Sequence, residues 1–240
     1  MTSFFQRQPD VTPSYTLRAL AHLLSYPGAE LRAVVPELQQ VLANEGAVSD
    51  QRLLGLNKLL GTLTQQDPFA VEEAYVELFD RGRATSLHLF EHVHGDSRDR
   101  GPAMIDLIKT YEQAGLMLDP NKVGGELPDY LPVVLEFVST LTAAQMRDFI
   151  GEIAHILNAV HTALVKRQSL YAHVLAAVLE IGNQDIETVA VVADEDLDAS
   201  WAEPEAFAGC SSKGQQSPDQ PQPIQIVRRS ASTSQRGASA

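Results

Sequence analysis

Apolar residues recur every three or four positions along most of this chain, and this period constrains the fold more than any other feature. Side chains three, four and seven positions apart lie on one face of an α-helix, whereas a half-buried strand requires alternation. The longest such series consists of Met146, Phe149, Ile150, Ile153, Leu157, Val160 and Leu164. Only residues 186–192 form a β-branched run, and one run cannot build a sheet. The pattern therefore predicts an all-α fold.

Start and stop signals divide the periodic stretches into separate helices. Thr12-Pro13 and Asp67-Pro68 each combine a capping residue with a proline suited to the first helical position, and Ser49 and Thr142 are further caps. We expect Pro36 to separate a short turn from a fresh helix, because proline lacks the backbone N–H. Glycines that end helices are expected at Gly28, Gly82, Gly115 and Gly182. The expected architecture is a single-domain bundle of about eight helices.

The composition changes at Asp194. Residues 194–205 hold six acidic side chains and no basic one, and the chain beyond them is rich in Ser, Gln and Pro. Such a composition cannot bury enough apolar surface to offset the entropy of ordering. We therefore expect residues 1–193 to form one all-helical domain and residues 194–240 to be an acidic linker and a disordered polar tail.

The formal net charge of −13 is unevenly distributed. Residues 209–240 carry four basic side chains against Asp219 alone, so the residues before them carry −16. A body this acidic repels nucleic acid and anionic lipid and favours a basic partner, such as a peptide with Arg and Lys. The single cysteine, Cys210, forms no internal disulfide, and no segment has the apolar run of a signal peptide or a membrane span. We expect a soluble, cytoplasmic protein that binds no nucleic acid and does not insert into a membrane.

The most unusual stretch is 88–104, HLFEHVHGDSRDRGPAM, in which three histidines stand among acidic and arginine side chains. One interpretation is a metal site formed by His88, His92, His94 and Asp96, as in a metal-dependent helical hydrolase. The spacing matches none of the recurring metalloenzyme motifs, however, and no second cluster supplies further ligands.

A structural role explains the same charges without a metal. Asp99 can accept backbone N–H bonds at the start of the next helix, and the arginines can pair with Glu91 or Asp96. The residues expected to order this loop are Asp96, Arg98, Asp99 and Arg100, with Gly95 at the turn. The chain also lacks a phosphate-binding loop and a nucleophile elbow, and its lone cysteine lies in the tail. We therefore expect a binding protein that is not an enzyme and holds no metal.

The same region resembles a known family. AYVELFDRGRATSLHLFEHVHGDSRDRGPAMIDL, residues 74–107, closely resembles the NarJ family, the delta-subunit assembly chaperones of respiratory nitrate reductase. ELPDYLPVVLEF, residues 126–137, is a second match, and LLSYP, residues 23–27, is a shorter third. The likeness covers roughly residues 12–182 and extends to the wider TorD-like group of chaperones for molybdenum enzymes, which are all-helical.

This resemblance implies a function in assembly. Members of the family recognise the N-terminal segment of the apo catalytic α subunit, an amphipathic helix with basic residues. They keep the enzyme competent for insertion of molybdenum cofactor and an iron–sulfur cluster, delay membrane attachment of the apo α–β complex, and leave the final enzyme. An acidic helical body with an apolar groove suits such a partner. No cofactor of the chaperone itself is implied.

The resemblance also implies where the peptide binds. The Tyr-x-x-Leu-Phe pattern of the wider group matches Tyr75, Leu78 and Phe79, for which plain core packing is an equal alternative. The Glu-Pro-x-Asp-His pattern falls on residues 126–130 with two departures: Leu127 precedes the proline, and Tyr130 replaces the histidine. A protonation role for that histidine therefore does not carry over, although Tyr130 can still donate a hydrogen bond.

Residues 87–92 are expected at the rim of the groove, where His88 and His92 would make binding sensitive to pH. The complete set of expected peptide-binding residues is Tyr75, Leu78, Phe79, Leu87, His88, Phe90, Glu91, His92, Pro128, Asp129 and Tyr130.

Overall fold

The computed structural model describes residues 11–81, 83–95, 97–119 and 125–190. These residues form nine α-helices and one short 3₁₀-helix, with no strand among them, which confirms the all-α prediction. The helices are α1 (Ser14–Leu23), α2 (Ala29–Glu45), α3 (Asp50–Gln65), α4 (Pro68–Phe79), η1 (Arg83–Thr85), α5 (Leu89–His94), α6 (Arg100–Gln113), α7 (Leu131–Val138), α8 (Ala143–Lys166) and α9 (Ala172–Ile181).

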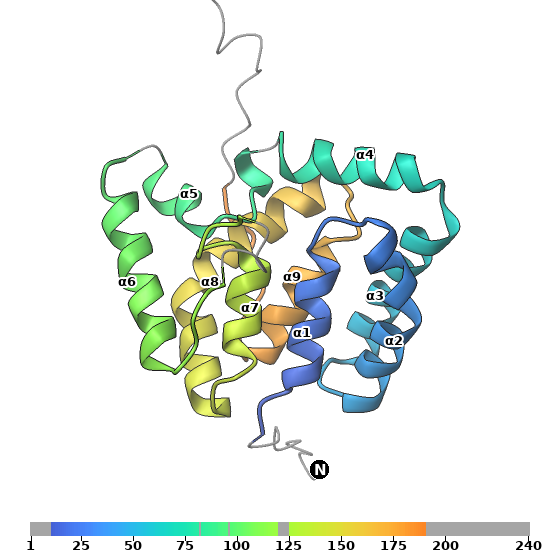
Figure 1. Ribbon diagram of the computed structural model, residues 1–240. Coiled ribbons are helices and arrows are strands. Elements are labelled where there is room, and N and C mark those ends of the chain that lie inside the picture. The colour runs from blue at the N-terminus through green and yellow to red at the C-terminus, as the bar shows by residue number, and fades with distance from the viewer. Residues whose placement is uncertain (1–10, 82, 96, 120–124, 191–240) are drawn as a thin grey trace, which may run out of the picture. The chain divides into compact units, whose positions relative to one another are not determined.

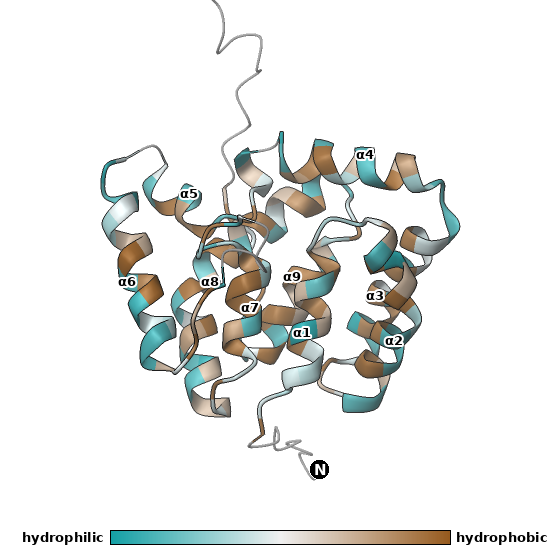
Figure 2. Cartoon of the chain, viewed as in Figure 1, coloured by the Kyte–Doolittle hydropathy of each residue, from teal (hydrophilic) through white to brown (hydrophobic). Residues whose placement is uncertain are grey.

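Helices α1, α7, α8 and α9 form the centre of the described residues, with α2 and α3 on one side and α6 on the other (Figure 1). Helix α1 packs against α7 and α2, α8 packs along α9, and α3 contacts α2 and α9. The apolar faces of these helices point toward one another (Figure 2). Side chains with no exposed surface in this core include Leu17, Leu20, Leu131, Leu135 and Leu175. Within the part of the chain that the structure describes, no helix has the length and apolarity that crossing a membrane requires.

Two of the predicted caps are confirmed. The Asp67 carboxylate accepts a backbone N–H from the first turn of α4 at 3.0 Å. Thr142 and Gln145 form a reciprocal capping box at the start of α8, in which each side chain accepts the other residue's N–H. Ser49 precedes α3 but accepts no N–H from it; its hydroxyl is turned toward the Glu180 carboxylate, to which it donates at 3.2 Å. Local capping signals therefore hold where no tertiary partner competes for the side chain.

Two expected boundaries are wrong. Pro36 lies inside α2, which is continuous from Ala29 to Glu45. A proline there costs about 3 kcal/mol, but Val35, Leu38 and Leu42 stay buried on the unbroken helix and offset that loss. Thr12 does not cap α1, since its hydroxyl donates to a backbone carbonyl beyond the end of α7 at 2.6 Å.

The polar segment 88–104, expected to be a loop, is largely helical. It contains α5 and the start of α6, which are separated by a turn at Gly95. The φ of Gly95 is 52°, as expected for a turn glycine, and Gly115 ends α6 with a φ of 79°. Gly82, expected to end α4, lies outside the described residues.

Candidate functional site

Two segments that are far apart in the sequence meet at the start of α5. The Leu89 N–H donates to the Asp129 carbonyl at 3.0 Å, and the Leu131 N–H donates to the Leu87 carbonyl at 2.8 Å. His88 and Tyr130 thereby form an isolated antiparallel β-bridge. The two longest motifs of the sequence analysis therefore build one site.

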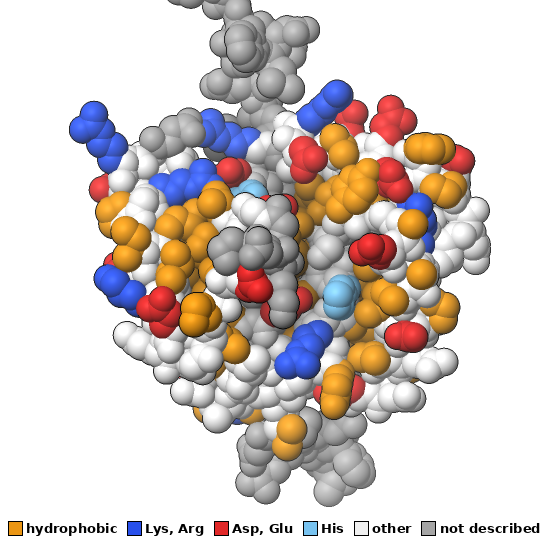
Figure 3. Space-filling model, viewed as in Figure 1, with side chains coloured by type: hydrophobic (Ala, Val, Ile, Leu, Met, Phe, Trp, Pro, Cys, Tyr) orange, Lys and Arg blue, Asp and Glu red, His pale blue; other side chains and the backbone are white. Residues whose placement is uncertain are grey.

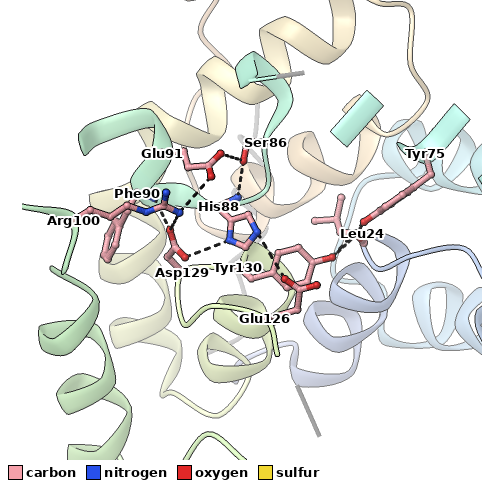
Figure 4. A network of polar contacts seen from close by, with 10 residues as sticks. All are labelled: Leu24, Tyr75, Ser86, His88, Phe90, Glu91, Arg100, Glu126, Asp129 and Tyr130. Carbon is pink, nitrogen blue, oxygen red and sulfur yellow. Dashed lines mark hydrogen bonds and ion pairs between the residues drawn. The ribbon is translucent and has the colours of Figure 1, made fainter. Parts of the chain in front are cut away.

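Asp129 is the common acceptor of this site (Figure 4). Its side chain has 0% exposed surface, and its carboxylate accepts the Phe90 N–H at 3.0 Å in the first turn of α5. Nδ1 of His88 lies 3.4 Å from one carboxylate oxygen, and the Arg100 guanidinium lies 3.8 Å from the other. A buried carboxylate needs such donors, because burying a charge without them is costly.

The His88 imidazole lies between two carboxylates. Its Nε2 is 3.7 Å from the half-exposed Glu126, opposite the contact with Asp129. The hydrogen bond to Asp129 raises the pKa of His88 above its ordinary value; partial burial opposes this shift, and the negative charges of Asp129, Glu91 and Glu126 reinforce it. The surrounding carboxylates therefore favour the positively charged form of His88, although the ring is partly buried.

Glu91 and Ser86 extend the polar contacts on the other side of α5. The Ser86 hydroxyl donates to Glu91 at 2.5 Å, and Arg100 lies 3.3 Å from the other oxygen of Glu91. His92 turns its Nε2 toward the Ser86 carbonyl at 2.8 Å. The Arg100–Glu91 ion pair joins the first turn of α6 to α5, and the two bonds of Ser86 fix α5 to the segment that precedes it.

The loop-ordering predictions have mixed outcomes. The pairing of Arg100 with Glu91 is confirmed. Asp99 precedes α6 but accepts no N–H from it, because its own backbone is already helical, with φ −73° and ψ −16°. Arg98 is exposed and makes no ion pair within the described part of the chain. Asp96 lies outside the described residues.

Tyr130 continues the site toward α4 and α1. Its ring lies against the His88 ring, with centroids 5.3 Å apart, and its hydroxyl is 3.3 Å from that of Tyr75. The Tyr75 hydroxyl donates to the Leu24 carbonyl at 2.7 Å. Burial raises the pKa of both phenols, so they remain neutral hydrogen-bonding groups at physiological pH.

The structure divides the expected peptide-binding residues into two groups. Tyr75, Phe79, Leu87 and Asp129 are buried, so the expectation that Leu87 lies at a rim is wrong, and core packing describes Tyr75 and Phe79. The other members keep part of their surface exposed: Leu78, His88, Phe90, Glu91, His92, Pro128 and Tyr130. The second group has surface that a ligand can reach, and two members of the buried group contact it: Asp129 bonds His88 and Phe90, and Tyr75 contacts Tyr130.

Two grooves border α4. One, of about 380 Å³, lies between α3, α4 and the turn from α8 to α9, and has walls that include Leu78 and Leu170. Tyr171 also lines it, and the buried Tyr171 hydroxyl has no hydrogen-bond partner among the described residues. The other groove, of about 420 Å³, lies along α4 beside Tyr26, whose ring meets the Tyr75 ring at 5.7 Å. The sequence reasoning missed both tyrosines; the short LLSYP match was the only signal for Tyr26.

Of the proposed metal ligands, Asp96 lies outside the described residues, and His88, His92 and His94 do not form a metal site with one another. Within the described residues, no three His, Cys, Asp or Glu side chains are close enough together to hold a metal ion. Nδ1 of His88 and Nε2 of His92 already face Asp129 and the Ser86 carbonyl. No observation therefore favours the hydrolase interpretation.

Comparisons with known proteins give consistent results. The family model described as nitrate reductase delta subunit matches residues 27–177. The chain is 40% identical over 194 residues to the nitrate reductase molybdenum cofactor assembly chaperone NarJ of Escherichia coli K12, covering 77% of this chain and 80% of that one. It is 34% identical over 168 residues to a probable NarJ chaperone of Bacillus subtilis, covering 69% of this chain and 88% of that one.

A solved structure, described as a putative redox enzyme maturation protein from Archaeoglobus fulgidus, aligns with a TM-score of 0.51 at 18% identity. The alignment covers 76% of this chain and 99% of that chain. At this identity the likeness concerns the fold alone.

Proposed function

The chain belongs to the nitrate reductase delta subunit family, and from that membership we propose that it is an assembly chaperone for a nitrate reductase. Its partner is the N-terminal segment of the apo catalytic α subunit, within the apo α–β complex. Binding keeps that subunit competent for insertion of molybdenum cofactor and an iron–sulfur cluster before membrane attachment, in the cytoplasm and without catalysis. The chaperone domain comprises residues 1–193, and residues 194–240 are an acidic linker and polar tail.

The 40% identity to an assembly chaperone over most of both chains is the observation that carries this proposal. The charge of the chain supports it, because residues 1–208 carry −16 and would attract a basic segment. The two motifs that suggested the family also meet in space, through the bridge between His88 and Tyr130.

The site offers the contacts that an amphipathic helix requires. The half-buried Tyr130 ring gives an aromatic surface, and Glu126 and Glu91 give carboxylates at its edge. Asp129 does not face the ligand, and it holds His88 and Phe90 in position from beneath. The arrangement suits a helix whose apolar side meets the ring and whose basic side chains reach the carboxylates.

Calorimetric titration with a synthetic peptide of roughly the first fifteen residues of the cognate α subunit tests the proposal. We expect a Kd of about micromolar strength and roughly tenfold weaker binding for Tyr130→Ala, since aromatic anchors commonly contribute 1 kcal/mol or more. Tyr130→Phe should retain most of the affinity if the ring is what the peptide contacts.

Tyr15→Ala is the matched control, because Tyr15 lies on α1 with 67% of its surface exposed. This variant should bind as the wild type does. If no heat of binding were detected at a high micromolar concentration of the peptide, the proposed peptide recognition would be refuted.

A further inference from the structure

Helix α4 exposes a stripe that the fold does not use. Phe69, Glu73, Val76 and Glu77 occupy positions i, i+4, i+7 and i+8 of the helix, so they lie on one face. Phe69 has 80% of its surface exposed, and both glutamates are exposed. We call these four residues the α4 stripe. Figure 3 shows apolar side chains standing among acidic ones over this helix.

The opposite face of α4 already supplies its contribution to the core. Val71, Tyr75 and Phe79 are buried there, with 5%, 5% and 6% of their surface exposed. Phe69 takes no part in this buried face; it lines the groove beside α4 together with Val76 and Tyr26. Exposed apolar groups that gather beside a groove are typical of interaction surfaces.

The carboxylates of α4 are not equivalent. Glu72 is held by Arg32 at 2.8 Å and by the Tyr26 hydroxyl at 3.0 Å, and both bonds lower the pKa of Glu72. Glu73 makes no ion pair within the described part of the chain. Glu77 faces Arg81 at 3.5 Å, with 69% and 65% of the two side chains exposed, a geometry that contributes little to stability.

Glu73 and Glu77 are also four residues apart, so their charges repel one another on the free helix. A basic side chain placed between them would relieve this repulsion. One helical turn separates the two carboxylates, so a partner helix with basic residues three or four positions apart matches their spacing.

We infer that the α4 stripe binds the basic and apolar face of the α-subunit segment, with Glu73 and Glu77 selecting its positive charges and Phe69 and Val76 covering its apolar residues. The inference rests on the proposed function and extends the binding surface beyond the expected peptide-binding residues, none of which belongs to the α4 stripe. The groove beside the stripe reaches Tyr26, whose ring contacts Tyr75 of the site. The Tyr75 hydroxyl in turn lies 3.3 Å from that of Tyr130, so the groove leads from the stripe to the site through these three tyrosines.

The experiment is a titration of the full chain with the same α-subunit peptide at two salt concentrations, about 50 mM and 500 mM. E73Q/E77Q should weaken binding roughly fivefold at low salt, and the difference should shrink at high salt because screening acts on exposed charges. F69A should also weaken binding, by a factor that salt leaves unchanged. A peptide whose Arg and Lys are replaced by Gln should bind the wild type more weakly. Its affinities for the wild type and for E73Q/E77Q should be equal.

The matched control is E112Q/E152Q, which removes the same charge from exposed positions on α6 and α8. Both double variants change the net charge equally, so E112Q/E152Q should bind as the wild type does if the position of the carboxylates, and not the net charge, determines affinity. Equal affinities of E73Q/E77Q, F69A and the wild type at low salt would overturn this inference and leave the proposed function intact. Equal weakening by the two double variants would also overturn it, because net charge alone would then explain the effect. A peptide that bound no variant, the wild type included, would overturn both.

Discussion

Asp129→Ala removes the acceptor on which three donors at the site converge. The change leaves the Phe90 N–H without its partner at 3.0 Å, and it deprives His88 and Arg100 of a carboxylate whose own exposure is 0%. The Arg100 guanidinium still has the Glu91 carboxylate at 3.3 Å, so the substitution does not leave its charge without an anionic partner. The backbone bonds of residues 87–89 with residues 129–131 also remain.

The expected cost follows from these contacts. Leaving a buried donor unsatisfied costs about 1–3 kcal/mol, and breaking a buried charge pair costs about 3–5 kcal/mol. About a quarter of the His88 and Arg100 side chains is exposed, at 25% and 24%, so the second figure must be reduced. We expect a loss of about 3 kcal/mol in the free energy of unfolding. Asp129→Asn keeps an oxygen for the Phe90 N–H and should lose only about 1 kcal/mol.

Urea unfolding followed by far-ultraviolet circular dichroism measures both variants. With a slope of about 2 kcal/mol per molar urea, the midpoint should fall by about 1.5 M for Asp129→Ala and about 0.5 M for Asp129→Asn, at unchanged slope. Equal midpoints for the two variants would show that the N–H acceptor is unimportant. A shift below about 0.5 M for alanine would refute the role of Asp129 as the centre of the site.

Two further changes test the same structure. The pKa of His88 is higher in the folded than in the unfolded state. The contribution of His88 to the free energy of unfolding is therefore complete below about pH 6.5 and is lost as the pH rises through the folded pKa. The unfolding midpoint of the wild type should therefore exceed that of His88→Gln by more at pH 6 than at about pH 8.5, and an equal gap at both would contradict this. Gly55→Ala would place a Cβ 2.4 Å from the His173 ring and should cost about 1–3 kcal/mol in thermal unfolding. Gly61→Ala is its control, with its nearest neighbour at 3.9 Å, and should be neutral or stabilising by up to about 1 kcal/mol.

The site illustrates how far sequence reasoning extends. The segments around His88 and Tyr130 were both singled out, one by its density of ionisable groups and both by the family resemblance. That they pair through a β-bridge could not be predicted, because no local pattern reports a contact across about forty residues. Leu87 was misplaced for the same reason: its neighbours are polar, and only the packing of the bundle buries it.

The helices show the same division. The sequence determined those with a long apolar series and a capping side chain of their own, such as α4 after Asp67 and α8 after Thr142, because their signals are local. Tertiary structure decided α2, in which core burial carries the helix through Pro36, and α5, whose first turn is completed by the buried Asp129. A helix of six residues is too short to be stable alone, so α5 depends on tertiary contacts, among them the burial of Leu89 and the Asp129 carboxylate that accepts the Phe90 N–H. The sequence by itself was therefore sufficient to predict the family and the helical class. The geometry of the site depends on contacts between distant segments that only folding brings together.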